Sequence, residues 1–493
     1  MRNFYYKMFS ILKVLRGHDL FPLIKHSILY GTGNICQRFL SLLLLPIYTR
    51  YLTPEAFGIV ALLSIAGMIL GAITLCGLTN GIGRYFYYSS KEGMTGSEVI
   101  WSPLFFVLAW SILILFPLWF ISSSISRLVF GTSEYSYLIE LTLLGVLLNN
   151  LGAIGRGILI FQERVMAVNF LNIGGVLVAV ASGLVLVAFF HRGVTGAVEA
   201  AVLSSAIMLI PLLIISVFRF KLSFSLDALQ KELKFSLPLV GAVVAFWLID
   251  FSDRYILKLF LPLSEVGLYN IGYNVGLLMM LVVSGFSSAW PPYYHKHNQH
   301  GEGQSICNNV LMIYLLGSCT CVVILSLASP LLLRLLTTQK FYCAFTVVPF
   351  VAMAYMLKGL YIVFIIGVTI KNKTTWQLYL ELCAALLNVI GNFLLIPIIG
   401  REAAALTTLV SYSVMVIGAY CMVTKINPIL NLSKGYILGM CLLTLAVSPN
   451  ILWVESTGLL GYIFCSILLI LMFLFSIVAF YKKNFLATRY NDS

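Results

Sequence analysis

The sequence predicts an all-α integral membrane protein, and three observations support this prediction. Of the 493 residues, 60% are hydrophobic and only 10% are charged, and the mean hydropathy is +0.98. These values exclude an ordinary soluble domain. The apolar residues form runs of about 20 residues, the length that a helix needs to cross a bilayer. The runs are continuous, whereas a transmembrane β-barrel shows short segments in which apolar and polar residues alternate.

Fourteen such runs predict fourteen transmembrane helices, and an even number places both termini on the same side of the membrane. The predicted spans lie near residues 27–48, 57–79, 100–120, 137–159, 168–190, 194–218, 235–259, 264–287, 307–333, 343–368, 375–397, 401–424, 434–452 and 458–481. Residues 1–26 contain basic residues with aromatic and aliphatic residues between them. This pattern predicts a cytoplasmic amphipathic segment on the membrane surface.

The net charge of +13 follows this topology. Of the 31 Lys and Arg residues, 21 lie at one set of span ends, 7 at the opposite set and 3 inside spans. Cytoplasmic loops of membrane proteins carry such an excess of basic residues, so both termini are predicted to be cytoplasmic. Because the basic residues alternate between loops and do not form one surface, we expect no nucleic-acid partner.

The most polar internal segment, residues 219–234, predicts a cytoplasmic linker between two lobes. A repeat supports this division, since LTPEAFGIV at 52–60 and LPLSEVGLY at 261–269 share Glu and Gly at an offset of about 210 residues. Six spans separate the copies, which indicates two pseudo-symmetric lobes of the same orientation around a central cavity. The predicted domains are the N-terminal segment 1–26, an N-lobe at 27–218 (spans 1–6), the linker, a C-lobe at 235–424 (spans 7–12), and residues 425–493 with the last two spans and a cytoplasmic tail.

The predicted span 235–259 carries three ionisable residues, Asp250, Asp253 and Arg254, toward its outer half. Charged side chains at such depth cost roughly 2.5–3.5 kcal/mol each, so they normally face a bundle interior or a watery cavity. Asp250 and Arg254 are four residues apart and share a helix face. Two interpretations stay open: an Asp250–Arg254 ion pair that neutralises both charges, or a group in which Asp253 is available as a gate or for a coupling ion.

Two further cations lie near the middle of predicted spans, Arg38 in the first and Lys358 in the tenth. They predict a cavity that attracts an anion such as a diphosphate, because Arg binds phosphate as a fork and Lys as a point charge. The alternative is a structural pair with an intramembrane carboxylate or with helix-end carbonyls. Arg84, at the cytoplasmic end of the second span, is either a contact for a phosphate head or a positive-inside anchor. Glu381, in the eleventh span, is either a coupling-ion carboxylate or a partner of Lys358.

Motifs of enzymes and of ATP-driven transport are missing from the sequence. It contains no Gly-Lys dipeptide, hence no Walker-type phosphate loop, and neither GxSxG nor HExxH occurs. His295, His297 and His300 lack the i, i+4 spacing of a helical zinc site, so no metal site is predicted. We therefore expect no catalytic residues and no cofactor, apart from a coupling proton or sodium ion.

Several local motifs resemble one family. They are LPIYTRYLTPEAFGIVAL (45–62), GIGRYFYY (81–88), WLIDFSDRYIL (247–257), SEVGLYNIGYNVG (264–276) and AWPPYY (289–294). Together with the span count, these motifs resemble the polysaccharide transporters of the multidrug/oligosaccharidyl-lipid/polysaccharide (MOP) exporter superfamily, in particular the Wzx-type O-antigen flippases. The resemblance implies alternating-access transport of an undecaprenyl-diphosphate-linked oligosaccharide from the cytoplasmic to the periplasmic leaflet of a bacterial inner membrane.

The resemblance also implies partners: the lipid-linked glycan, membrane lipids, and a polymerase and chain-length regulator of the same pathway. The residues predicted for substrate binding are Arg38, Arg84, Arg254 and Lys358, and those predicted for coupling or gating are Asp250, Asp253 and Glu381. Two rival functions are considered. A drug or ion antiporter of the same superfamily would have an acid-dominated cavity. A membrane-bound O-antigen polymerase or ligase would have a large periplasmic loop, whereas the predicted outer loops reach only about 16 residues.

Overall fold

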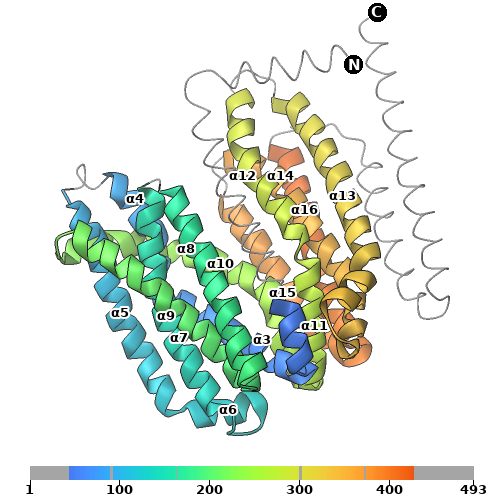
Figure 1. Cartoon of the computed structure of the whole chain (residues 1–493). Coiled ribbons are helices and arrows are strands. Elements are labelled where there is room, and N and C mark those ends of the chain that lie inside the picture. Colours follow the sequence, from blue (N-terminus) through green and yellow to red (C-terminus); the bar gives the residue numbers. More distant parts are fainter. Residues whose placement is uncertain (1–43, 89–92, 163, 299–302, 371–373, 427–493) are drawn as a thin grey trace, which may run out of the picture. The chain divides into compact units, whose positions relative to one another are not determined.

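The computed structural model describes residues 44–88, 93–162, 164–298, 303–370 and 374–426. Every regular element in these ranges is a helix, as Figure 1 shows. The predicted all-α fold class is therefore confirmed for this part of the chain. The predicted segment 1–26, most of the predicted first span and all of the last two spans lie outside the described residues, so the count of fourteen stays a prediction.

The helices follow the predicted spans from 57–79 to 401–424 closely. In chain order they are α3 (Pro54–Leu75), α4 (Leu78–Tyr88), α5 (Gly96–Phe120), α6 (Ser122–Phe130), α7 (Ser136–Phe161), α8 (Val165–Gly183) with the π-helical turn η2 (Leu184–Phe189), α9 (Gly193–Arg219), α10 (Leu226–Phe260), α11 (Leu263–Gly276), α12 (Met279–Asn298), α13 (Gly303–Leu336), the 3₁₀ segment η3 (Gln339–Val347), α14 (Val348–Ile370), α15 (Thr374–Ile399) and α16 (Arg401–Ile426).

Eight helices in the described ranges are long and apolar enough to cross a membrane. Helices α11 and α12 meet at a bend of 47° and pass the same test as a pair, which raises the number to nine. A soluble domain could not hide this many apolar helices, so the chain is a multi-pass membrane protein.

The chain divides into two compact units, each described here by itself. Unit 1 contains residues 63–241 and the chain up to residue 51, and unit 2 contains residues 52–62 and the chain from residue 242 onward. One division, after residue 51, precedes α3, and the other two fall inside α3 and α10. Helix α10 begins at Leu226, inside the linker predicted at 219–234, and continues without a break to Phe260. The predicted lobe limits and the central cavity stay predictions.

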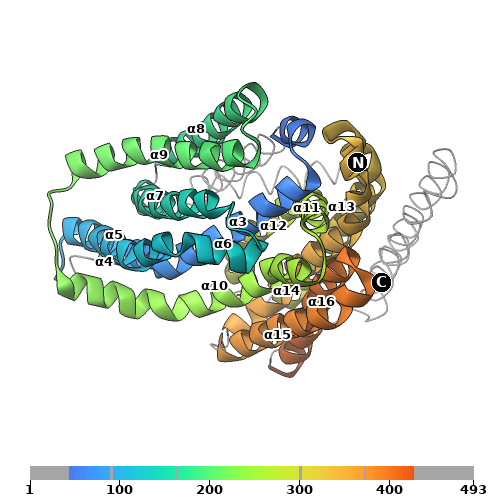
Figure 2. The same ribbon diagram turned by 90° about the horizontal axis from the view of Figure 1, so that it is seen from below.

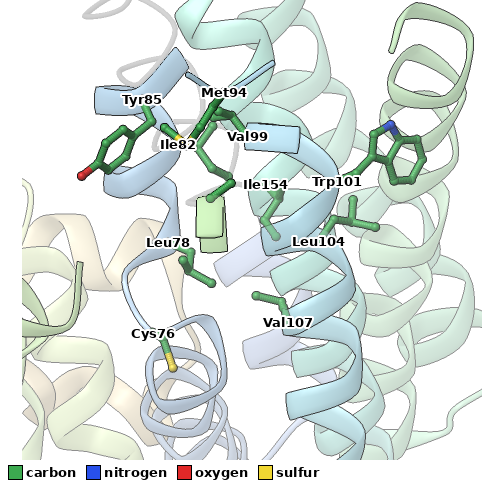
Figure 3. Close-up of a cluster of buried hydrophobic side chains, with 11 residues drawn as sticks. Cys76, Leu78, Ile82, Tyr85, Met94, Val99, Trp101, Leu104, Val107 and Ile154 are labelled. Carbon is green, nitrogen blue, oxygen red and sulfur yellow. The ribbon is translucent and has the colours of Figure 1, made fainter. Parts of the chain in front are cut away.

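Unit 1 is held together by α7, which packs against α5 and α9, while α8 packs against α9 (Figures 1 and 2). Helix α5 begins with a capping box, in which Thr95 Oγ1 accepts the N–H of Glu98 and the Glu98 carboxylate accepts the N–H of Thr95. An apolar cluster with side chains from α4, α5, α7 and α10 fills the cytoplasmic end predicted for this unit (Figure 3). Within it, Leu78, Ile82 and Ile154 have no exposed surface.

Unit 2 is built around α14, which packs against α11, α12, α13 and α16 (Figure 1). Almost all of its side chains are buried, from Val348 to Val368. Because α14 is apolar on every side, it fits the interior of a helical bundle and not its rim. An ionisable residue on this helix therefore faces other protein groups.

The two copies of the sequence repeat meet inside unit 2. Gly58 of α3 and Gly267 of α11 approach so closely that a Cβ atom on Gly267 would lie 3.0 Å from the Gly58 amide nitrogen and would collide with the Pro54 carbonyl oxygen. A Cβ atom on Gly58 would likewise collide with the carbonyl oxygen of Leu263. Glycine at equivalent positions of both copies is what allows these backbones to cross in contact.

Candidate functional site

The ionisable residues of α10 lie in a buried cluster of unit 2, which we call the charged network. It joins four helices through two ion pairs and four tyrosines. Its members are Asp250, Asp253 and Arg254 of α10, Tyr269 and Tyr273 of α11, Tyr355 and Lys358 of α14, and Tyr412 of α16.

Asp253 and Arg254 form the inner ion pair of this network. Arg254 Nη1 donates to Asp253 Oδ1 at 2.8 Å, and the two side chains are 2% and 0% exposed. Tyr269 Oη donates to the other oxygen of the same carboxylate. Arg254 Nη1 also donates to the backbone carbonyl of Asp250. A fully buried charge is tolerated only with such compensation, so each partner holds the other in place.

Aromatic rings enclose the guanidinium of Arg254. Its Cζ lies 3.8 Å from the ring centre of Tyr273, 5.1 Å from that of Tyr269 and 5.5 Å from that of Phe251. Cations over aromatic faces gain from the ring quadrupole, and more so where water is excluded. Arg254 is thus sealed inside unit 2.

Asp250 and Lys358 form the second ion pair, which is less enclosed. Lys358 Nζ donates to Asp250 Oδ2 at 3.0 Å, and the side chains are 15% and 11% exposed. Tyr412 Oη donates to Asp250 Oδ1 at 2.7 Å. The hydroxyls of Tyr273 and Tyr355 lie 2.6 Å apart and connect the surroundings of the two pairs. The charges of the two carboxylates and the two cations sum to zero. Of the two cations, Lys358 is the more exposed, at 15% against 2% for Arg254.

These pairings decide one of the interpretations that the sequence left open. The side chains of Asp250 and Arg254 do not pair with each other, because Arg254 pairs with its neighbour Asp253 and Asp250 pairs with Lys358. Asp253 has no exposed surface, and its role in coupling or gating stays a prediction. Adjacent helix residues point about 100° apart, but the long Arg stem folds back to reach Asp253, while α14 supplies Lys358 from 108 residues away.

Glu381 of α15 is separate from these ion pairs. It is 1% exposed and accepts hydrogen bonds from Tyr361 Oη at 2.8 Å and Gln377 Nε2 at 2.9 Å. The expected pair with Lys358 is therefore not formed, because Lys358 already binds Asp250. The coupling role of Glu381 stays a prediction.

The two remaining predicted cations belong to the N-terminal part of the chain. Arg38 lies outside the described residues. Arg84 of α4 is exposed, and its Cζ lies 4.6 Å from the ring centre of Phe235. Among the described residues it forms no ion pair, so both interpretations of Arg84, a phosphate contact and a membrane anchor, stay open.

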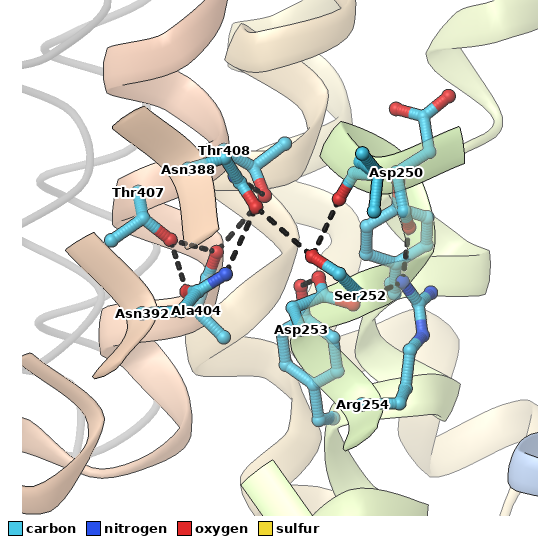
Figure 4. A network of polar contacts seen from close by, with 12 residues as sticks. Asp250, Ser252, Asp253, Arg254, Asn388, Asn392, Ala404, Thr407 and Thr408 are labelled. Carbon is cyan, nitrogen blue, oxygen red and sulfur yellow. Dashed lines mark hydrogen bonds and ion pairs between the residues drawn. The ribbon is translucent and has the colours of Figure 1, made fainter. Parts of the chain in front are cut away.

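An uncharged polar network beside α10 was not predicted (Figure 4). Asn392 Nδ2 donates to Asn388 Oδ1 at 2.9 Å, and Asn388 Nδ2 donates to Thr408 Oγ1 at 3.4 Å. Thr407 donates to Asn392, and Ser252 lies 3.5 Å from Asn388 Oδ1 and so joins α10 to α15 and α16. The signal in the sequence was two Asn residues one turn apart in an apolar span. Because its members satisfy one another, this network fixes three helices around the charged network.

The described residues contain no group of three or more His, Cys, Asp or Glu side chains that would hold a metal ion. The chemistry that the charged network offers is electrostatic. Asp250 and Lys358 can each exchange the other for an external partner. Asp253 and Arg254 are enclosed, and both carboxylate oxygens of Asp253 are bound, while Arg254 Nε has no hydrogen-bond partner among the described residues.

Comparison with known proteins then identifies the family. Residues 23–296, more than half of the chain, match the family described as polysaccharide biosynthesis protein. The chain belongs to this family. The resemblance to polysaccharide transporters inferred from the local motifs is thereby confirmed.

Individual relatives agree with this assignment. The chain is 23% identical over 324 residues to the succinoglycan biosynthesis transport protein ExoT of Rhizobium meliloti, a match that covers 64% of this chain and 62% of the relative, less than two thirds of its length. Among solved structures, the lipid II flippase MurJ in an inward closed conformation matches with a TM-score of 0.70 at 15% identity, over 94% of this chain and 100% of MurJ. An inward-facing MATE transporter of the MOP superfamily matches with a TM-score of 0.65 at 14% identity, over 80% and 95%. These structures establish the fold.

Proposed function

We propose that this protein is a flippase that moves a polysaccharide precursor on an undecaprenyl-diphosphate carrier from the cytoplasmic to the periplasmic leaflet of a bacterial inner membrane. The family match over residues 23–296 carries this proposal. The names of two similar proteins, a succinoglycan transport protein and a lipid II flippase, support it.

The geometry of the charged network supports different roles for its two cations. Arg254 is enclosed by Asp253 and aromatic rings, so it holds α10 and α11 in register. Lys358 keeps 15% of its side chain exposed and has a single carboxylate partner, Asp250. An anionic carrier can compete with Asp250 for this compact ammonium, because Lys binds phosphate as a point charge without a fixed fork. In the proposal Lys358 therefore meets the substrate, with Arg38 and Arg84 as further predicted contacts.

The same exchange provides a place for ion coupling. When Lys358 turns to an anion, Asp250 loses its counter-charge in a partly buried position, which favours uptake of a proton or a sodium ion. Release of this ion from Asp250 would restore the Asp250–Lys358 pair and displace the substrate from Lys358. Coupling is accordingly proposed at Asp250, ahead of Asp253 and Glu381, which are enclosed.

A deletion strain tests the flippase function. We expect the strain to accumulate lipid-linked repeat units that a membrane-impermeant glycan-modifying reagent does not reach in spheroplasts, because the units stay in the cytoplasmic leaflet. Accumulation of single units that the reagent does reach would contradict the proposal and indicate a polymerase.

Variants of Lys358 test the site. Lys358→Ala should abolish complementation at native expression, and the double variant Asp250→Asn/Lys358→Ala should not restore it, although removal of both charges relieves the unpaired carboxylate. Lys340→Ala, which removes an exposed lysine of the same unit, serves as the matched control and should complement fully. Full complementation by the double variant would show that the pair is only structural.

A further inference from the structure

Unit 1 contains a cavity of about 200 Å³ that none of the predicted site residues line. It lies between α7, α8 and α9, which run side by side in Figures 1 and 2. Its polar lining consists of Asn149 and Arg156 of α7, Asn172 of α8, and Ser204 and Ser205 of α9. The rest of the lining is aliphatic or glycine.

Arg156 gives this cavity its charge. Its Nη2 donates to Asn149 Oδ1 at 3.1 Å, and no carboxylate of the described residues forms an ion pair with it. Arg156 lies near the end of the membrane-length helix α7, which ends at Phe161, and a long basic side chain there can keep its charge in a polar environment. Here the neighbour is a neutral amide, so the positive charge remains available.

Two asparagine amides add hydrogen-bond donors to the guanidinium, whereas the two serine hydroxyls do not. Asn149 uses its carbonyl oxygen for Arg156, which leaves its amide N–H₂ to donate. Asn172 lines the same cavity and adds a second amide N–H₂ group. Ser204 donates to the Gly175 carbonyl at 2.7 Å and Ser205 to the Ala201 carbonyl at 3.0 Å, so both hydroxyl protons are already used within the unit. A guanidinium and two amides around one space suit an oxyanion, and the guanidinium fork suits a phosphoryl group in particular.

The size of the cavity limits the ligand. Pockets for drug-sized molecules measure about 300–1,000 Å³, so this cavity accommodates one phosphorylated headgroup and not a whole oligosaccharide. Arg156 also lies at the end of α7 that the charge bias places toward the cytoplasm, the leaflet where a lipid-linked precursor is made.

We propose that this cavity is an anion subsite in which Arg156, Asn149 and Asn172 bind the phosphoryl group of a membrane lipid. The inference deepens the proposed function, on which it rests for the identity of the lipid as the polyprenyl-diphosphate carrier. Binding to Arg156 in unit 1 would precede the exchange at Lys358 in unit 2. An anionic phospholipid offers the same chemistry, and the experiment separates the two sources.

Binding is measured with the full-length protein in nanodiscs of phosphatidylcholine, titrated with undecaprenyl diphosphate. Arg156→Gln should weaken binding by about 10- to 100-fold, because a charge-assisted hydrogen-bonded pair contributes about 1.5–3 kcal/mol. Arg127→Gln, which removes an exposed arginine of the same unit, is the matched control and should bind like the wild type. Undecaprenol, which has no phosphate, should bind equally to the wild type and to Arg156→Gln.

A second variant keeps the proposal testable if Arg156→Gln does not fold. Asn172→Asp preserves the shape of the side chain and supplies Arg156 with a carboxylate, so it should reduce diphosphate binding at least as strongly while the protein remains folded. Unchanged binding in both variants, or an equal loss in Arg127→Gln, would overturn the subsite.

Competition identifies the source of the phosphoryl group. We expect undecaprenyl diphosphate to bind equally well when phosphatidylglycerol replaces part of the phosphatidylcholine. Displacement by phosphatidylglycerol would overturn the carrier assignment. Because these measurements need no transport, they can fail while the deletion strain still accumulates precursor, or succeed while it does not.

Discussion

Arg254 in unit 2 and Arg156 in unit 1 are two arginines within long helices, and they are treated in opposite ways. Arg254 has a carboxylate, a tyrosine-rich enclosure and 2% exposure. Arg156 has one amide partner and borders a cavity. The charge of Arg254 is neutralised by a buried carboxylate, whereas the charge of Arg156 has no carboxylate partner among the described residues and can bind a ligand. The role of an arginine in a long apolar helix can therefore be inferred only together with its partners.

The comparison extends to the carboxylates. Both carboxylate oxygens of Asp253 accept hydrogen bonds, one from Arg254 and one from Tyr269, so neither is free for another partner. Asp250 is bound by Lys358 and Tyr412 and retains some exposure. Unit 2 thus combines a sealed pair that fixes geometry with a looser pair that can exchange partners.

The largest expected effect comes from breaking the sealed pair. Arg254→Gln should destabilise the protein by about 3–5 kcal/mol, because it leaves the buried Asp253 carboxylate without its counter-charge. Arg156→Gln should cost less than about 1 kcal/mol, because no buried charge loses its partner. Thermal unfolding of both purified variants in the same detergent measures the difference. An equal loss of stability in the two variants would contradict the distinction between Arg254, which stabilises the fold, and Arg156, which is free to bind a ligand.

A smaller effect is expected where the repeat copies cross. Gly267→Ala would push a methyl group into the Pro54 carbonyl, and α11 would have to move, carrying Tyr269 away from Asp253. Overpacking of this kind costs about 1–3 kcal/mol. Gly285→Ala on α12 is the matched control, since among the described residues no atom outside its own helix backbone and chain neighbours lies within 4 Å of its Cβ position. It should be neutral or slightly stabilising, as alanine favours a helix over glycine.

Thermal unfolding of both glycine variants checks this prediction, and a thermal midpoint for Gly267→Ala at or above that of Gly285→Ala would contradict the close crossing. Comparison with Arg254→Gln then shows how much of the sealed pair depends on the position of α11. If the crossing positions Tyr269, the losses of stability in Gly267→Ala and Arg254→Gln should be less than additive in the double variant, because both substitutions disturb the same contacts.

Hydropathy predicted the helices well because membrane insertion depends on local apolar length, which a single sequence contains. The span predicted at 100–120 is found as α5, Gly96–Phe120. The same reasoning recognised that charges lie within predicted spans, since a break in an apolar run is also local. The placement of Asp253 and Arg254 inside the bundle of unit 2 follows from the cost of exposing them to lipid.

Pairing could not be predicted, because it depends on which helix faces which. Asp250 and Lys358 are 108 residues apart, and nothing in the spacing preferred this pair to Asp250–Arg254. The polar network around Asn388 carries no charge and therefore left the apolar run intact. Arg156 was counted among the basic residues at span ends, and only the packing of α8 and α9 against α7 places it beside a cavity.

Unlike Asp253, Glu232 is a buried ionisable residue without a charged partner among the described residues. The effect expected from it is the smallest, a change in stability with pH. It lies in the segment predicted to be cytoplasmic, has no exposed surface, and neither carboxyl oxygen has a partner among the described residues. A Cβ atom on Gly81 of α4 would lie 3.2 Å from the Glu232 backbone oxygen, so α4 packs closely against this part of α10. Burial raises the pKa of Glu232 to about 9. Asp253 is stabilised in the bundle by an ion pair with Arg254, whereas Glu232 stays uncharged because it keeps its proton.

The pH dependence of stability tests this treatment. Between the ordinary Glu pKa of about 4.3 and the raised value of about 9, the folded protein holds a proton that the unfolded chain releases. The contribution of Glu232 to stability is therefore greatest below about pH 4.3 and falls through neutral pH, by at most about 1.4 kcal/mol per pH unit. Glu232→Gln should flatten the dependence of the thermal midpoint on pH between pH 6 and pH 8, whereas Glu98→Gln, at a half-buried capping residue, should keep the wild-type slope. A slope unchanged in Glu232→Gln would mean that the carboxyl is ionised and paired in the folded protein, like Asp253.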